Sequence, residues 1–135
     1  MAPLLADLLV AQIDQVIFPD SIVPMPLHPA RLRERGFNQA LEIARCVARK
    51  TSITLLPDVC ERIKNTASQT RLPWKEREKN IRGAFACEMD MTGKHIAVLD
   101  DVMTTGATLN ELAGVLCARG AVKVSGWVVA RTARE

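Results

Sequence analysis

The stretch Ile-Ala-Val-Leu-Asp-Asp-Val-Met-Thr-Thr-Gly-Ala-Thr, residues 96–108, decides how the rest of the chain is interpreted. Its first four residues are apolar and bounded by charge, which predicts a strand buried in a parallel sheet. The acidic pair Asp100 and Asp101 follows at the expected carboxyl end of that strand. A loop of small and hydroxylated residues around Gly106 comes next. Two carboxylates and a closely fitting backbone loop are therefore expected at one edge of a sheet.

A βαβ unit is predicted around this stretch. The sequence Thr-Leu-Asn-Glu at 108–111 has the form of a capping box, which predicts a helix that begins at Thr108. Arg119 and Gly120 give the signal for its end. Segment 122–130 then predicts the next strand, and strands joined by such a crossover lie parallel. The predicted fold class is α/β, with a mostly parallel central sheet flanked by helices.

The upstream elements fit a single domain over residues 1–135. An N-terminal helix is predicted within residues 1–19, on the periodicity of 3–17, and a short strand at 21–23. Three prolines in 24–29 predict a shaped loop. A second helix is expected after Asn38, which can act as its N-cap, and further strands at 57–63 and 81–87. Segment 64–79 lacks an apolar period and is predicted to be a long, flexible loop.

Charge and composition point to an anionic ligand. The chain has a net charge of +3, and residues 31–82 hold 13 of its 18 basic residues against six acidic ones. Polyphosphate and nucleic acid both fit such a positive region. With only three Phe, two Trp and no Tyr, the sequence offers little for a single-strand stacking platform, and it contains no duplex-reading motif. Direct nucleic-acid binding is therefore the weaker interpretation.

The cysteines and the N-terminus indicate a cytoplasmic protein. The four cysteines form no C-x-x-C pair, which argues against a zinc site and against a disulfide framework. Cys46 and Cys117 fall in helical patterns and are expected to be buried thiols. The N-terminal segment lacks the pattern of a signal peptide, and its acidic residues interrupt any membrane span.

The chemistry of 100–108 suits a ribose 5-phosphate unit. A helix N-terminus offers N–H groups and a partial positive charge to a phosphate. Two carboxylates would repel that phosphate, but they accept hydrogen bonds from ribose hydroxyls and suit a nearby Mg²⁺. The alternative is an exposed acidic pair followed by a threonine-rich helix cap.

The segment is similar, at every position, to the phosphoribosyl pyrophosphate (PRPP) binding signature of type I phosphoribosyltransferases. The resemblance implies that Asp100 and Asp101 are the catalytic residues, which hold the ribose hydroxyls and, indirectly, Mg²⁺. It also implies that the ribose and its 5′-phosphate lie on the loop that follows, formed by Met103, Thr104, Thr105, Gly106, Ala107 and Thr108.

Other segments resemble the ComF/GntX group of competence-associated phosphoribosyltransferase-like proteins. They are Val-Pro-Met-Pro-Leu at 23–27, Arg-Gly-Phe-Asn-Gln at 35–39, and the spaced residues Arg62, Gln69, Leu72, Arg77, Asn80 and Phe85. This resemblance covers roughly residues 20–130. Members of that group usually carry an N-terminal cysteine-rich zinc module, which these residues do not show. A homodimer is expected from the resemblance alone.

Two basic segments are candidates for the pyrophosphate of PRPP. Loop 24–39 brings three arginines to the carboxyl edge of the predicted sheet, where the acidic pair is expected. The guanidinium group of arginine suits phosphate oxygens. We expect its contacts to come from Arg35, Gly36, Asn38 and Gln39, although Asn38 also serves as a helix cap. Segment 64–79 resembles the mobile lid of type I phosphoribosyltransferases, with Arg71 and Arg77 placed to neutralise the leaving pyrophosphate. A solvated basic turn is the alternative for both.

Two functions remain open on the sequence. One is an enzyme that transfers the phosphoribosyl group of PRPP to a small-molecule acceptor, expected to be a nucleobase, with release of pyrophosphate and with Mg²⁺ as cofactor. The other is a non-catalytic PRPP or nucleotide-binding module that supports DNA uptake or processing. They differ in whether an acceptor pocket exists, and the sequence shows no convincing one.

Overall fold

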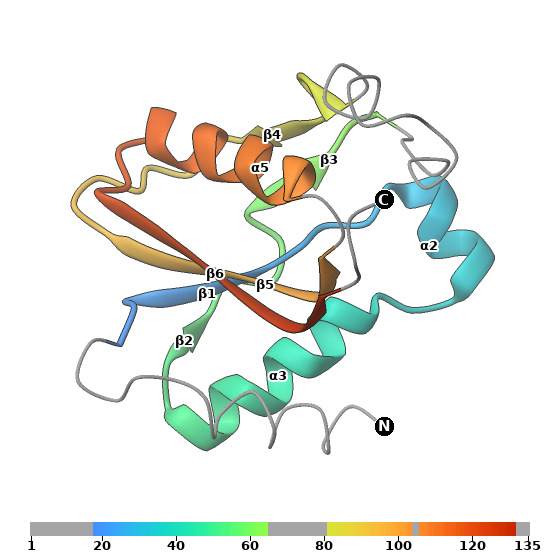
Figure 1. Ribbon diagram of the computed structural model, residues 1–135, viewed down its shortest axis with the longest axis horizontal. Helices are drawn as coiled ribbons and strands as arrows, with labels where there is room; N and C mark the ends of the chain where they lie inside the picture. The colour runs from blue at the N-terminus through green and yellow to red at the C-terminus, as the bar shows by residue number, and fades with distance from the viewer. Residues whose placement is uncertain (1–17, 65–80, 104–105, 132–135) are drawn as a thin grey trace.

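The computed structural model describes residues 18–64, 81–103 and 106–131, the side chains of 102, 103, 130 and 131 excepted. The predicted N-terminal helix, most of the predicted lid with Arg71 and Arg77, and the two threonines Thr104 and Thr105 lie outside these residues. The described part forms three layers, with a sheet between helices α3 and α5 (Figure 1). None of its helices is both long and apolar enough to span a bilayer.

The central sheet is parallel throughout. Its strands are β1 (Ser21–Pro24), β2 (Thr54–Leu55), β5 (His95–Met103) and β6 (Lys123–Arg131), in the order β2-β1-β5-β6. The inner strands β1 and β5 are covered on both faces, which is why the apolar run of residues 96–99 is fully buried. The prediction of a mostly parallel sheet flanked by helices is confirmed.

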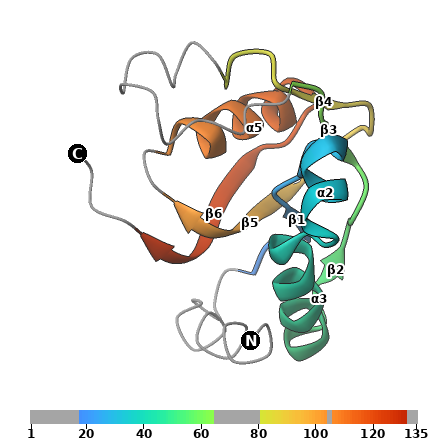
Figure 2. The same cartoon turned by 90° about the vertical axis from the view of Figure 1, so that its right-hand side faces the viewer.

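One helix covers each face of this sheet (Figure 2). Helix α3 (Gln39–Thr51) buries Ile43, Ala44 and Val47 against β1 and β5. Helix α5 (Ala107–Ala118) buries Leu112 and Leu116 on the opposite side. The strand–helix–strand crossover from β5 through α5 to β6 is the βαβ unit that the sequence predicts.

A second, two-stranded sheet joins β3 (Cys60–Arg62) and β4 (Phe85–Cys87) in antiparallel register. Both strands fall within the ranges predicted from the sequence but are shorter than those ranges. The pair brings together the two ends of the segment that separates them. The Ile63 amide donates to the Ala84 carbonyl at 2.6 Å, and Lys64 Nζ donates to the Arg82 carbonyl, also at 2.6 Å.

The prediction of a continuous loop over 24–39 is wrong, because helix α2 (Pro29–Arg35) lies within it. Pro29 occupies the first turn, where its missing N–H costs nothing. His28 caps the helix, since its Nδ1 accepts from the Ala30 amide at 3.1 Å. Gly36, with φ of 81°, ends it in the left-handed conformation. Pro24 and Pro26 exclude a helix before Pro29, whereas Pro29 itself favours the start of one.

Three further expectations about the βαβ unit are wrong. Asp100 and Asp101 lie inside β5 and not beyond it, because the strand keeps pairing with β6 as far as Met103 opposite Arg131. The N-cap of helix α5 is Gly106, two residues before Thr108, the N-cap of the predicted capping box, and no side chain of the described residues makes a cap bond. Cys117, expected to be buried, is exposed, whereas Cys46 is buried as expected.

Gly120 is expected to be essential for the turn after α5. Its φ is 109°, and a Cβ atom there would lie 2.8 Å from Thr92 Cα and 2.9 Å from Thr92 N. Because both strain and backbone collision oppose a side chain, Gly120→Ala should cost about 2 kcal/mol of unfolding free energy. Urea denaturation measures this change.

Gly114 provides the matched control for that substitution. It lies within α5, and a Cβ atom there would have no heavy atom within 4 Å. Gly114→Ala should stabilise the protein by up to about 1 kcal/mol through helix propensity alone. Equal losses for the two variants would contradict the role given to the Gly120 backbone.

Candidate functional site

The candidate site lies at the carboxyl edge of the central sheet. Strands β1, β5 and β6 all end there, and α2 stands beside this edge (Figure 1). The Met25 amide donates to the Leu99 carbonyl at 2.8 Å, which fixes the start of the loop after β1 next to the acidic pair. Ligands of open parallel sheets bind at such an edge.

The two carboxylates of β5 form one electrostatic unit. The Asp101 amide donates to Asp100 Oδ1 at 2.9 Å. Burial of Asp100, a hydrogen bond with the Asp101 side chain and repulsion by the Asp101 charge raise the pKa of Asp100 from 3.8 to about 7. The positive charge of Arg62 opposes this rise but does not cancel it. Near neutral pH the acidic pair is therefore stabilised by a bound proton, by a cation or by hydrogen-bond donors.

Arg62 lies near this acidic pair, and Arg31 lies near Arg62. Arg62 of β3 is half-buried, with its Cζ atom 5.3 Å from the centroid of the Phe85 ring. Burial and the nearby charge of Arg31 lower the pKa of Arg62, while the charge of Asp100 raises it. Arg31 of α2 is also half-buried, and its Nε atom lies 3.9 Å from Glu34 Oε2. The edge of the sheet thus carries positive charge beside the carboxylates.

The start of α5 suits an anion. Gly106 is its N-cap in the left-handed conformation with φ of 82°, and no side chain among the described residues caps the helix. Ala107 and Thr108 form the first turn and are half-buried. Strand β5 ends at Met103, and the described chain resumes at Gly106. A strand that turns through glycine into a helix directs backbone N–H groups at a phosphate.

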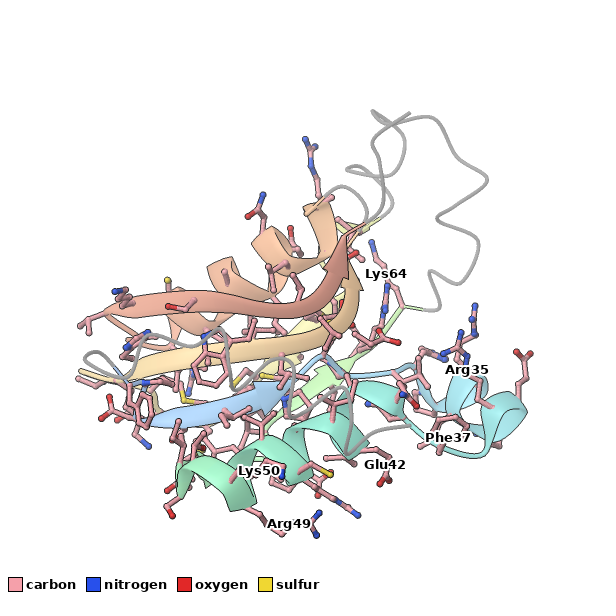
Figure 3. All side chains as sticks on the ribbon, turned by 60° about the horizontal axis from the view of Figure 1, so that its bottom comes forward. Arg35, Phe37, Glu42, Arg49, Lys50 and Lys64 are labelled. Carbon is pink, nitrogen blue, oxygen red and sulfur yellow. The ribbon has the colours of Figure 1, made fainter. Side chains whose placement is uncertain are left out.

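The residues expected on the pyrophosphate occupy the junction of α2 and α3. Arg35 and Gly36 end α2 and are exposed, and Figure 3 shows the Arg35 side chain on α2, away from the central sheet. Asn38 caps α3: its Oδ1 accepts from the Ala40 amide at 3.0 Å, and its Nδ2 donates to the Met25 carbonyl at 3.1 Å. Gln39 is the first residue of α3 and is half-buried. Asn38 therefore anchors the loop after β1 to the helix that follows.

Sequence reasoning gave no role to Arg62 and favoured Arg35 over Arg31. The structure brings Arg62 close both to Asp100 and to Arg31, although these three residues are far apart in the chain. The signal for Arg62 was its place in a predicted strand among the residues of the family resemblance. Nothing in the sequence singled out Arg31 among the three arginines of segment 24–39, because the direction of its side chain depends on the helical form of α2.

The cysteines differ sharply in exposure, which gives a labelling prediction. Cys60 and Cys87 are buried and face each other across β3 and β4. Burial and the neighbouring Cys87 raise the pKa of Cys60 to about 12. At pH 8 in the native state we expect iodoacetamide to modify the exposed Cys117, and the three buried thiols only after unfolding. Peptide mapping checks this, and rapid modification of Cys60 in native protein would contradict it.

The acidic pair is the candidate set of oxygen ligands for Mg²⁺ in the described part of the chain. No group of three or more His, Cys, Asp or Glu side chains that could hold a metal occurs among the described residues. Two adjacent carboxylates, one of them with a pKa raised by burial and by its neighbour, suit a hard divalent cation that shares its shell with ligand oxygens and water. The residues fit an ion bound together with the ligand and not a protein-only cage.

No known family profile matches the chain. It is 34% identical over 120 residues to competence protein F of Haemophilus influenzae, covering 87% of this chain and 52% of that protein. The chain is a homologue of competence protein F. It is likewise 36% identical over 114 residues to DNA utilization protein YhgH of Escherichia coli K12, covering 84% and 50% of the two chains. With competence protein ComFC of Bacillus subtilis it shares 33% identity over 125 residues, covering 86% and 48%.

The chain spans about half the length of these relatives. Its fold matches solved phosphoribosyltransferase structures. Glutamine PRPP amidotransferase from B. subtilis aligns with a TM-score of 0.62 and 19% identity, over 95% of this chain and 26% of that one. Purine phosphoribosyltransferase from Pyrococcus horikoshii aligns with a TM-score of 0.51 and 16% identity, over 99% and 80%. The homologue of competence protein F therefore has the type I phosphoribosyltransferase fold.

Proposed function

We propose that the chain binds PRPP at the carboxyl edge of its sheet and transfers the phosphoribosyl group to a nucleobase. One observation carries the proposal: the acidic pair of β5 leads through a short loop into α5, which begins at Gly106. Asp100 and Asp101 would accept hydrogen bonds from the ribose hydroxyls. The loop and the first turn of α5 would take the 5′-phosphate. The names of the relatives, competence and DNA utilization, favour a role linked to DNA use.

The reaction is a substitution at C1′ of the ribose. A nitrogen of the base forms a bond to C1′, and the bond from C1′ to the pyrophosphate oxygen breaks. The electron pair of that bond leaves with pyrophosphate, and the base nitrogen gives its proton to solvent. Arg31 and Arg62 would stabilise the negative charge that develops on the leaving group, and Asp100 and Asp101 would hold the ribose.

The acidic pair would hold Mg²⁺ indirectly, through shared ribose oxygens and water. The bound ion would supply charge neutralisation for pyrophosphate. Asp100 would bind in its ionised form, since ribose hydroxyls donate hydrogen bonds to a carboxylate.

The second candidate is a non-catalytic PRPP or nucleotide-binding module that supports DNA uptake or processing. The names of the relatives favour it, because none of those quoted states a transferase activity. Both candidates require the same PRPP site. They differ in whether pyrophosphate is released when an acceptor is present.

Calorimetric titration of PRPP into the protein in the presence of MgCl₂ tests the shared site. We expect saturable binding in the micromolar range that is lost with excess EDTA. A coupled assay for pyrophosphate, run with a panel of nucleobases, then separates the two candidates. Folded protein that gives no binding heat would overturn both. Binding without pyrophosphate release from any base would favour the non-catalytic module.

A further inference from the structure

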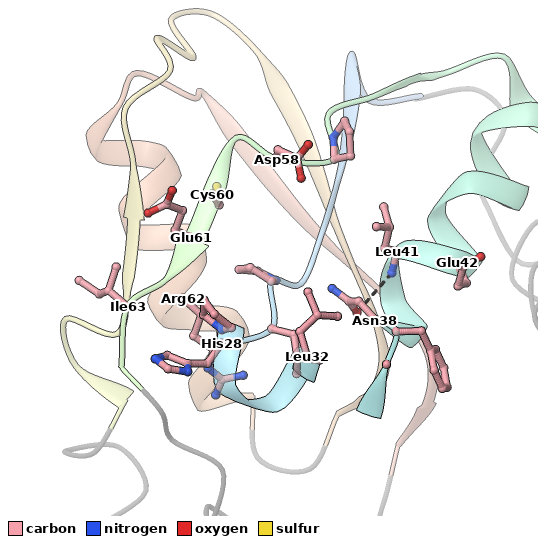
Figure 4. Close-up of a pocket in the computed structure, with 16 residues that line it drawn as sticks. His28, Leu32, Asn38, Leu41, Glu42, Asp58, Cys60, Glu61, Arg62 and Ile63 are labelled. Atoms are coloured by element: carbon pink, nitrogen blue, oxygen red, sulfur yellow. Dashed lines mark hydrogen bonds between the residues drawn. The ribbon is translucent and has the colours of Figure 1, made fainter. Parts of the chain in front are cut away.

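A cavity of about 580 Å³ lies between helix α2, the start of α3 and strand β3. Figure 4 shows Leu32 and Asn38 on its helical side and Cys60 to Ile63 on its strand side. Large apolar side chains are exposed at its wall, with Leu32 41%, Phe37 49% and Ile63 54% accessible. Surface side chains of this size usually have a partner when they gather around a hollow. The volume falls in the range of small-molecule sites.

This cavity adjoins the proposed PRPP site. Its wall includes residues 26–29, which directly follow Met25, and Met25 is bonded to Leu99 immediately before the acidic pair. Arg62 also lines the cavity, and its charge acts on Asp100. One side chain is thus shared between the cavity and the carboxylates.

The strand side of the cavity offers backbone hydrogen-bonding groups. The Ile63 amide, just after β3, bonds to the Ala84 carbonyl, so by the alternation of antiparallel pairs the backbone groups of Glu61 are the ones in β3 that face β4. The N–H and C=O of Cys60 therefore point away from β4, and Cys60 lines the cavity. A donor and an acceptor on one residue can pair with the edge of a planar heterocycle.

The remaining polar groups set the preferred ligand. Three acidic residues, Glu42, Asp58 and Glu61, contribute to the lining of the cavity, and Figure 4 shows the side chains of Glu42 and Glu61 directed away from its centre. Carboxylates accept hydrogen bonds and donate none when ionised, so they favour amino groups over keto groups. Apolar walls formed by Leu32 and the prolines of the β1–α2 loop suit the faces of a ring.

We propose that this cavity is the acceptor pocket and that it takes a planar nitrogen heterocycle carrying an exocyclic amino group. The proposal rests on the function proposed above. The heterocycle lies against Leu32, with its polar edge on β3 and its amino group near Asp58. Its reacting nitrogen faces the side of the cavity that Arg62 shares with the acidic pair.

The test measures binding of four free bases to the full chain with PRPP and MgCl₂ present. Saturation-transfer NMR and calorimetry should show adenine and cytosine binding at least about tenfold more tightly than hypoxanthine and uracil, because the exocyclic oxygen of the keto bases cannot donate to a carboxylate at the position of the amino group. Asp58→Asn should reduce that preference to about threefold or less. Pyrophosphate release should follow the same order.

Leu32→Trp fills the cavity from a position that has no proposed contact with PRPP, although Gly36, Asn38 and Arg62 line the same cavity. We expect base binding and pyrophosphate release to fall by at least about tenfold, while the affinity for PRPP stays within twofold. Val122→Trp is the matched control, since Val122 is 72% exposed just before β6, at the amino end of the sheet. It should change neither quantity. Circular dichroism of both variants shows whether they fold.

The outcomes separate this inference from the function on which it rests. Loss of base binding in folded Leu32→Trp with PRPP affinity retained supports the acceptor pocket. Unchanged base binding in that variant, or no binding of any base to wild type that binds PRPP, overturns it. Wild type that fails to bind PRPP overturns the proposed function itself, and the assignment of the cavity as an acceptor pocket falls with it.

Discussion

Replacement of Asp100 and Asp101 together by asparagine is expected to weaken binding of PRPP with Mg²⁺ by at least about 100-fold. Hydrogen bonds to charged groups contribute about 1.5–3 kcal/mol each, so the loss of two corresponds to about 3 kcal/mol or more, and each 1.4 kcal/mol is a factor of ten. The variant also removes the negative charge that would attract Mg²⁺. Calorimetric titration of PRPP in MgCl₂ measures the change directly.

The matched control removes two carboxylates elsewhere. Glu88 and Asp90 are exposed and precede β5, at the amino end of the sheet. Glu88→Gln/Asp90→Asn has the same net charge as the Asp100/Asp101 double variant, and it should bind PRPP as wild type does. Equal weakening in both double variants would show a long-range charge effect, and it would contradict direct contacts from the acidic pair.

The sequence was sufficient for the part of the fold that rests on buried strands. The apolar run 96–99 and the capping function of Asn38 are local patterns with local causes, and the structure reproduces them. Where the prediction failed, tertiary pairing was responsible. Asp100 and Asp101 belong to β5 because β6 continues beside them, and no local pattern marks that continuation.

The site was harder to predict because it is assembled from distant segments. Asp100 could be proposed from the motif around it. The approach of Arg62 depends on β3 pairing with β4 beneath α5, which no periodicity in the sequence reveals. The cavity beside α2 was missed for a similar reason. Its helical wall exists only because Pro29 starts a helix. From a predicted loop, the direction of the Leu32 side chain could not be derived.

The acidic pair should make the protein less stable as the pH rises from 4 to 8. The pKa of Asp100 is raised from 3.8 to about 7 by burial and by Asp101, so the folded state binds more protons than the unfolded state between these values. Stability is then fully present below about pH 4 and is lost as the pH passes through the folded pKa. At about 1.4 kcal/mol per pKa unit, the loss attributable to Asp100 approaches about 4 kcal/mol.

Asp100→Asn should remove this slope, because the amide cannot ionise. Urea denaturation without ligand should find the variant close to wild type at pH 4 and more stable at pH 8, whereas Glu88→Gln should follow wild type throughout. An unchanged slope in Asp100→Asn would assign the effect to another group.

Repulsion between the charges of Asp100 and Asp101 should also make PRPP with Mg²⁺ stabilise the wild-type protein more at pH 8 than at pH 6. Ligand binding would relieve the repulsion within this charged pair, which is unfavourable in the free protein. A thermal shift that is larger at pH 6 would contradict binding to the ionised pair.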